Sequence, residues 1–478
     1  QAIFRHSLFL LTRTCGTIKY SGAFPSASYL PNDKPPRDMV QFFQPKPKAL
    51  PTQAVEITID NLDHHLTGVG RYQGKACFVE GVLPGEKVSV QITEQKKQYA
   101  HARLRKVIEP SADRCEPFCP AFKQCGGCNA QMMPQALQCQ AKQDGVQRLF
   151  HQLAKIDLPA PAWIESSEQQ AYRRVCRLAV KYDKNKRCVL VGFRQKQSQA
   201  LVEIGGCPVL TAALSALIVP LRALINELSS ARDVGHVELY DTESGLAMLL
   251  RHNGRPPARD KELLLAFAAQ HQCALYLQTT GYPEPLSEVA PSFYELDALR
   301  LYFQPGDFLQ VNPQVNQRLV NHVREWLAPT NTDRILDLFC GIGNFTLPLA
   351  RDAASVTGIE GVDEMVQRAA HNAEQNQLVN AEFHRADLTK MAEYANAGWQ
   401  QQCYDLILLD PGRAGAEEVM PWLEKSNARR IVYVSCNPVT AARDCALLQP
   451  GYTLKQWGLL NMFPHTGHVE SLFLFERK

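Results

Sequence analysis

The chain has 478 residues, 45% hydrophobic and 21% charged, and at roughly 100–200 residues per domain this length predicts two to four domains. Glycine (28) and proline (30) are ordinary, which excludes a collagen-like or disordered chain, and no apolar run approaches the roughly 20 residues of a membrane span. The net charge of +3 conceals a gradient: residues 1–210 hold 29 Lys and Arg against 17 Asp and Glu, a net of +12, whereas residues 211–478 hold 22 against 31, a net of −9. The N-terminal part is therefore suited to bind a polyanion.

The N-terminal segment predicts a tail and a reducing location. Residues 1–46 lack periodicity and include a basic, proline-rich stretch, so we expect a flexible tail or extension. Arg13 interrupts its short apolar run and no clean cleavage site follows, which argues against a signal peptide. Met39 precedes a plausible mature start, so residues 1–38 are expected to be an addition to it. Fifteen cysteines in so long a chain indicate reduced thiols and a cytoplasmic protein rather than a disulfide framework.

Residues 47–110 predict a small β-barrel. Short alternating strands are separated by glycine turns, which is typical of barrels that bind oligonucleotides. A solvated basic surface is the alternative. The expected outer face carries Lys75, Lys87, Lys96, Lys97, Tyr99, His101, Arg103 and Arg105.

A cysteine cluster opens the next region. Cys119 is followed after five residues by Cys125-Gly-Gly-Cys128, and Cys115 lies four residues before Cys119. This thiolate-rich, histidine-poor spacing suits an iron–sulfur cluster or zinc. Cys207, in GGCPVL, is a candidate for a distant fourth ligand.

Residues 160–330 mix strands with helices, and their last helix is expected to begin soon after Pro313. The segment 172–196 is densely basic, with interleaved aromatic residues, which favours a phosphate-contacting face over a solvated hairpin. Its residues of interest are Tyr172, Arg173, Arg174, Arg177, Lys181, Tyr182, Lys184, Lys186, Arg187, Phe193, Arg194 and Lys196.

From Asp333 onward, strands and helices alternate, which predicts a mostly parallel sheet covered on both faces. The first strand runs into the glycine loop 340–344, and acids follow later strands as Glu360, Asp387 and Asp410. An acid at the end of the second strand can accept hydrogen bonds from ribose hydroxyls. Because the loop lacks a full GxGxxG pattern, it favours S-adenosylmethionine over a dinucleotide.

Two further residues are candidates for catalysis. Cys436 ends a buried strand just before Asn437-Pro438 and a helix, where ligands bind and where a helix N-terminus is expected to lower the thiol pKa. This position favours a nucleophile over a buried structural cysteine. Glu470, after His465 and His468, could act as a base, although a surface acid is equally compatible with the pattern.

Seven motifs in order connect these features: CPAFKQCGGC, GGCPVL, GDFLQVN, LDLFCGIGNF, LLDPGRAGA, VSCNP and HTGHVE. From Met39 to Lys478 the chain resembles the RNA uracil-C5 methyltransferases, and most of all those acting on 23S ribosomal RNA. The resemblance implies a multidomain α/β protein with an N-terminal OB-like TRAM β-barrel (residues 47–110). A central α/β domain with a [4Fe–4S] cluster (111–320) and a C-terminal Rossmann-like S-adenosylmethionine-dependent methyltransferase domain (321–478) would follow.

The resemblance also implies roles for individual residues. Cys436 would be the nucleophile and Glu470 the general base, with Cys115 and Cys340 outside the site. The cluster ligands would be Cys119, Cys125, Cys128 and Cys207, and S-adenosylmethionine would be held by Gln310, Phe339, Asn344, Glu360, Asp387 and Asp410.

The expected substrate is a flipped uracil in a loop of 23S ribosomal RNA, bound by a monomer with no membrane contact. A uracil-C5 methyltransferase for another ribosomal position or for transfer RNA is the alternative, and a non-catalytic RNA-binding factor is a further one. The cysteine cluster and the barrel disfavour the transfer-RNA enzymes, and intact Cys436 and Glu470 argue against lost catalysis.

Overall fold

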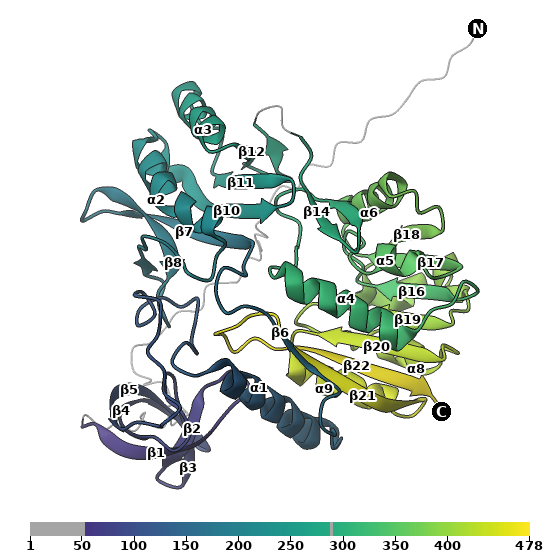
Figure 1. The fold of residues 1–478 in the computed structure, drawn as a ribbon, viewed down its shortest axis with the longest axis horizontal. Coiled ribbons are helices and arrows are strands. Elements are labelled where there is room, and N and C mark those ends of the chain that lie inside the picture. Colours follow the sequence, from purple (N-terminus) through teal and green to yellow (C-terminus); the bar gives the residue numbers. More distant parts are fainter. Residues whose placement is uncertain (1–52, 287–289) are drawn as a thin grey trace, which may run out of the picture. The chain divides into compact units, whose positions relative to one another are not determined.

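Five strands close into the barrel predicted for residues 47–110 (Figure 1). The computed structural model describes residues 53–286 and 290–478, so the tail predicted for residues 1–46 lies outside the described residues. Alternating residues such as Ile57, Ile59 and Val90 fill the barrel, while the side chains of the last strand that alternate with them face outward. The strands, in the order β1-β2-β3-β5-β4, are β1 (Val55–Leu62), β2 (Gly68–Tyr72), β3 (Lys75–Val79), β4 (Lys87–Gln95) and β5 (Tyr99–Glu109).

The cysteine segment follows the barrel and leads into a long helix. Residues 111–134 form turns, after which α1 (Gln135–Leu149) runs into a π-helical turn, η1 (Phe150–Ala154). Strand β6 (Ile164–Ser166) then joins the C-terminal sheet beside its last-but-one strand. The region predicted as a central domain therefore contributes a strand to the methyltransferase sheet.

A seven-stranded sheet forms the middle of the chain, in the order β13-β12-β11-β10-β7-β8-β9. Two helices pack on it and bury leucine and isoleucine side chains against its core. The elements are β7 (Val175–Asp183), β8 (Cys188–Arg194), β9 (Leu201–Val202), α2 (Ala212–Glu227), the 3₁₀ turn η2 (Ala231–Asp233), β10 (Val234–Thr242), β11 (Gly245–His252), α3 (Ala258–Gln270), β12 (Cys273–Gln278) and β13 (Glu284–Pro285).

A hairpin and one helix lead into the last sheet. β14 (Phe293–Leu296) pairs with β15 (Leu299–Tyr302), and α4 (Pro313–Leu327) begins where predicted. Asn312 caps α4 by accepting a hydrogen bond from the Val315 amide, and Pro313 takes the first helical position, where no amide is needed. The boundary predicted between residues 320 and 321 falls inside this helix.

The C-terminal sheet, green to yellow in Figure 1, has eight strands in the order β18-β17-β16-β19-β20-β22-β21-β6. Strands β16 to β20 are parallel, as predicted, and β22 is antiparallel to β20 and β21. The elements are β16 (Arg334–Leu338), α5 (Thr346–Ala350), β17 (Ser355–Glu360), α6 (Asp363–Gln375), β18 (Ala381–Arg385), η3 (Leu388–Tyr394), α7 (Gly398–Gln401), β19 (Leu406–Leu409), α8 (Met420–Glu424), β20 (Arg430–Ser435), α9 (Pro438–Leu448), β21 (Tyr452–Asn461) and β22 (Glu470–Arg477).

Across residues 53–286 and 290–478, no helix is both long enough and apolar enough to cross a membrane.

Candidate active site

The candidate catalytic and cofactor residues share one edge of the C-terminal sheet. Glu360 ends β17, Phe339 follows β16, Asp410 follows β19 and Cys436 follows β20. These strands are parallel neighbours, so their carboxyl ends meet at one edge. Because β22 runs in the opposite direction, its first residue, Glu470, lies at that edge as well. The structure therefore brings together residues far apart in the sequence.

Cys436 and Glu470 face each other across adjacent strand ends, because they continue the antiparallel register one step beyond the Ser435–Ser471 pair. Glu470 is only 7% exposed, which excludes the surface acid that the sequence left open. Burial and the nearby Asp410 raise the pKa of Glu470 well above its usual range.

The pKa expected for Cys436 is wrong in direction. Burial, followed by the charges of Glu470 and Asp410, raises the pKa of this thiol to about 12. The N-terminus of α9 favours a thiolate at Cys436, but burial and the two carboxyl groups disfavour it more strongly. The substrate-free protein therefore holds Cys436 as a thiol.

One exposed cation counters these acids. Arg413, in the loop after β19, lowers the pKa of both Cys436 and Glu470, and its guanidinium lies 3.5 Å from Nδ1 of His468. Asp410 is half-buried directly after β19, and this burial raises its pKa to about 7. The edge thus combines a thiol, Cys436, with an acid, Asp410, whose pKa lies near neutral pH.

The glycine loop is held by the acid predicted to bind ribose. The Glu360 carboxylate accepts hydrogen bonds from the amide of Gly341 at 3.1 Å and from that of Gly361 at 2.8 Å. Phe339 and Gly343 both have positive φ, at 65° and 97°, so the chain turns sharply above the end of β16. These bonds fix the Glu360 side chain beside the loop where a cofactor would lie.

Asn344 and Gln310 belong to a second group around the same loop. Asn344 exchanges two side-chain hydrogen bonds with Asn316 and accepts a third from the Tyr294 hydroxyl. Gln310 is buried, and its carbonyl accepts a hydrogen bond from Nε of Arg174. The amide side chain of Asn344 is therefore oriented by the protein itself.

Asp387 sits apart from these residues, after β18 at the rim of the sheet. Its side chain caps η3 by accepting bonds from the amide and hydroxyl of Thr389, which lower its pKa. It is about half exposed, with 46% of the side chain accessible.

The predicted cluster cysteines line one cavity of about 240 Å³. Its walls include Cys119, Cys125, Cys128 and Cys207, whereas Cys115 is exposed and outside it. Burial raises the pKa of Cys128 to about 12, with smaller contributions from the other three thiols. The amide of Gly127 lies 3.4 Å from the Cys125 sulfur.

The shape of this cavity bears on which centre it suits. Among the described residues, no three His, Cys, Asp or Glu side chains lie as close together as the ligands of a single ion. The four thiols instead line one space, together with the more deeply buried Cys176. This arrangement fits a polynuclear iron–sulfur centre, which requires four thiolates.

The basic segment 172–196 is only partly available to a phosphate. Tyr172 and Arg174 are buried, at 7% and 2% exposure, and Arg174 stacks on the Tyr294 ring. Arg177 is paired with Glu238. The expectation of a phosphate-contacting face is wrong for Tyr172 and Arg174, because the segment just before β7 turns them inward, onto the carbonyls of Pro464 and Gln310. Lys181, Lys184, Lys186, Arg187 and Arg194 remain exposed.

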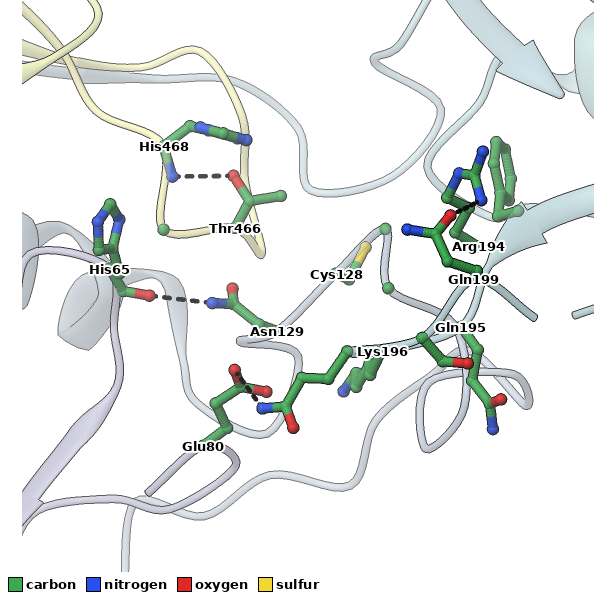
Figure 2. Close-up of a pocket in the computed structure, with 16 residues that line it drawn as sticks. His65, Glu80, Cys128, Asn129, Arg194, Gln195, Lys196, Gln199, Thr466 and His468 are labelled. Carbon is green, nitrogen blue, oxygen red and sulfur yellow. Dashed lines mark hydrogen bonds between the residues drawn. The ribbon is translucent and has the colours of Figure 1, made fainter. Parts of the chain in front are cut away.

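A larger cavity, of about 660 Å³, adjoins the loop that precedes Glu470 (Figure 2). It is lined by His65 from the barrel, by Cys128 and Asn129 from the cysteine segment, and by His468. Figure 2 shows the Asn129 side chain donating to the His65 carbonyl, at 2.9 Å. The barrel, the cysteine segment and the loop before Glu470 therefore meet at one opening.

The sequence did not reveal two residues of α1 that hydrogen-bond to the segment 461–465, just before the loop that leads to Glu470. Gln138 and Lys142, one turn apart on α1, are fully buried. Gln138 accepts from the His465 amide at 2.8 Å, and Lys142 donates to Asn461 at 2.7 Å. In the sequence, the only sign of their burial was that Gln138, Lys142 and Val146 are spaced four residues apart and so share one face of the helix. Because two of these three residues are polar, that face did not stand out as a buried one.

Comparison with known proteins gives two family matches. Residues 297–478 match the family described as tRNA (Uracil-5-)-methyltransferase, and residues 48–104 match the TRAM domain.

Relatives and a solved structure extend these matches to most of the chain. The chain is 92% identical over 440 residues to a Tolumonas auensis protein named 23S rRNA (uracil(1939)-C(5))-methyltransferase RlmD. It is 53% identical over 442 residues to the Aeromonas hydrophila protein of the same name. Both matches cover 92% of this chain and 100% of the relative. The crystal structure of Pyrococcus abyssi tRNA (uracil-54, C5)-methyltransferase with S-adenosyl-L-homocysteine has a similar fold, with a TM-score of 0.67 at 22% identity, over 88% of this chain and 100% of that one.

Proposed function

The chain belongs to the family of S-adenosylmethionine-dependent RNA uracil-C5 methyltransferases, and from this membership we propose which residues carry out its reaction. Its activity is the methylation of uracil C5 in 23S ribosomal RNA, at U1939, the position for which its relatives are named. The family predicted from the seven motifs is thereby confirmed, as is a TRAM barrel combined with a methyltransferase fold.

The reaction needs a nucleophile because uracil C5 is unreactive toward a methyl sulfonium. In the proposal, the Cys436 thiolate adds to C6, and the electrons of the C5–C6 double bond make C5 nucleophilic. S-Adenosylmethionine would supply an electrophilic methyl group: C5 bonds to it, and the electron pair of the broken S–CH₃ bond stays on sulfur, leaving S-adenosylhomocysteine. Glu470 then removes the C5 proton, and the re-formed double bond expels the Cys436 thiolate.

Cofactor binding falls to the residues around the glycine loop. Glu360 is suited to the ribose hydroxyls, because its carboxylate lies at the end of the second strand and is oriented by the loop amides. We assign Gln310, Phe339, Asn344, Asp387 and Asp410 to the same cofactor. Asp410 would lie between the cofactor and the flipped uracil.

The observation that carries this function is the meeting of Cys436, Glu470 and Asp410 at the edge beside the glycine loop. We expect the purified protein to transfer a labelled methyl group from S-adenosylmethionine to a 23S fragment containing U1939. The control fragment carries cytidine at that one position and should remain unlabelled. Equal labelling of both fragments, or labelling of transfer RNA alone, would contradict the assignment.

We propose that the 660 Å³ cavity admits the RNA loop. A stacked uracil cannot present its ring to a thiol and to a methyl donor, so the base must flip out of its loop. The cavity leads from the barrel to His468, next to Arg413, so RNA bound along it would pass the catalytic edge. Exposed Tyr99, His101 and Arg103 on β5 offer stacking and charge to the flanking nucleotides.

We propose further that Cys119, Cys125, Cys128 and Cys207 hold a [4Fe–4S] cluster in their cavity. Support comes from the chemistry of the donors, four thiols around one space, and from the Gly127 amide directed at the Cys125 sulfur. Such N–H bonds to sulfur stabilise the thiolate charge of iron–sulfur sites. The raised thiol pKa values mean that binding would have to displace protons.

Anaerobically purified protein is expected to be brown and to contain about four irons per chain. Cys207→Ala should lose most of the iron and the visible absorbance, because the substitution removes one of the four proposed cysteine ligands from the cavity. Cys115→Ala is the matched control and should retain both, since Cys115 is exposed outside the cavity. A colourless zinc protein, or equal iron in the two variants, would refute the ligand set.

We propose that the protein is cytoplasmic, in agreement with its ribosomal substrate. We also propose that it is a monomer. The cysteines of the described residues are all free thiols, which suits a reducing compartment. Light scattering of the purified chain would test the monomer directly.

A further inference from the structure

Lys142 is a buried ionisable side chain that the reaction described above does not use. It has no exposed surface, and its Nζ donates to Asn461 Oδ1 at 2.7 Å and to the Phe463 carbonyl at 3.4 Å. Within the part of the chain that the structure describes, it takes part in no ion pair. Since a buried charge without a counter-ion is unfavourable, its presence here requires an explanation.

The contacts of Lys142 lead directly to the catalytic base. Asn461 is the last residue of β21, and the residue before it, Leu460, pairs with Glu470 at the start of β22. The ammonium group thus holds the strand end opposite the base, from a helix more than three hundred residues earlier in the chain.

The charges around this pair are few. Asp410 and Arg413 face Glu470 along with Lys142, and the Cys436 thiol lies beside it. On its other side Lys142 faces Cys139 of its own helix, and burial lowers the pKa of Lys142 to about 7. Burial, with a smaller contribution from the charge of Lys142, lowers the pKa of His465 and of His468 to about 4, so both rings are neutral at pH 7.

We propose that Lys142 is a positioning residue for Glu470: its ammonium group fixes the end of β21 and supplies the buried positive charge that favours the ionised base. This inference rests on the assignment of Glu470 as the base. Arg413 supplies positive charge too, but it is exposed and open to the RNA. Lys142 is closed to both solvent and RNA, so RNA binding does not displace its contact with Asn461.

The base must be ionised to take the C5 proton and must release that proton before the next turnover. Burial and Asp410 oppose ionisation, whereas Lys142 and Arg413 favour it. Removing the Lys142 charge therefore raises the pKa of Glu470, and the pH at which the base becomes active rises with it.

The test compares Lys142→Met with Lys155→Met, an exposed lysine just after η1. Covalent capture of 5-fluorouridine RNA reports the Cys436 step, and single-turnover release of methylated uridine RNA, followed against pH, reports the Glu470 step. We expect Lys142→Met to form the adduct, but its pH profile of product release should move to higher pH by about one unit. On the acid side of the profile, this corresponds to about tenfold slower release. Lys155→Met should match the parent in both.

A second variant separates charge from packing. Asn461→Asp keeps the side-chain size and the bond to Lys142 but places a negative charge beside the ammonium. It should shift the release profile in the same direction, even if Lys142→Met does not fold. An unshifted profile in Asn461→Asp, or in a folded Lys142→Met, overturns the inference. If Glu470→Gln failed to stall release, the assignment of the base would fail instead, and the two failures are thus distinguishable.

Discussion

Cys436→Ala is expected to lower methyl transfer to 23S RNA by about a million-fold, the scale of losing a covalent nucleophile. Without the thiol, no adduct forms at C6, and C5 stays too weak a nucleophile to accept the methyl group. The measurement is incorporation of labelled methyl groups under single-turnover conditions. A gel-shift assay with 5-fluorouridine RNA should show no denaturation-resistant complex.

The matched control is Cys403→Ala, because Cys403 is an exposed thiol away from the sheet edge. This variant should methylate and form the covalent complex at the parent rate. If Cys436→Ala kept measurable turnover while still binding RNA, the nucleophile would have to be another group. Cys340, the other thiol at this edge, is fully buried and its pKa is raised well above the usual range, so it is unsuited to replace Cys436.

The high pKa of Cys436 adds a pH dependence to the first step. With a pKa near 12, the thiolate fraction rises about tenfold for each pH unit below that value. Formation of the 5-fluorouridine adduct should therefore accelerate with pH across the neutral range, unless binding of the RNA itself removes the proton. This dependence follows from burial and from the neighbouring carboxyl groups.

Local sequence patterns were sufficient for the barrel and for the parallel strands of the C-terminal sheet, but not for β6, which the region predicted as a central domain adds to that sheet. Glycine turns between alternating strands predicted the barrel, and the strand-to-glycine-loop transition at Phe339 predicted the cofactor edge. Acids at strand ends, such as Glu360 and Asp410, could be placed because parallel strands must end on one side of a sheet. These features depend on periodicity and chain direction, both of which are legible in a single sequence.

Tertiary contacts decided what the sequence could not. The pKa of Cys436 was misjudged because a local rule for helix N-termini ignores burial and the carboxyl groups that other strands bring near. Arg174 looked like part of a basic surface, but the segment before β7 places its side chain against the Gln310 carbonyl. Lys142 carried no motif, and its proximity to Glu470 exists only once α1 packs beneath the last strands.

Glu470→Gln is expected to separate the two halves of the reaction. Adduct formation and methyl transfer should proceed, whereas removal of the C5 proton should slow by about 10²–10⁴-fold, the usual contribution of a general base. The first half should not suffer, because the charge of Glu470 raises the pKa of Cys436 and a neutral amide would relieve that effect. With ordinary uridine RNA, the methylated covalent complex should accumulate and be visible on a denaturing gel.

The control for this substitution is Glu476→Gln on the same strand, whose side chain pairs with Arg430 and Lys455 far from the edge. It should turn over normally and leave no complex on the gel. Normal release by Glu470→Gln would require another base, and among the residues that the structure describes Asp410 is the acid whose charge acts on Glu470. An equal loss of adduct formation and release would instead indicate that Glu470 shapes the pocket. Accumulation of the complex is the outcome that only a base acting after methyl transfer can produce.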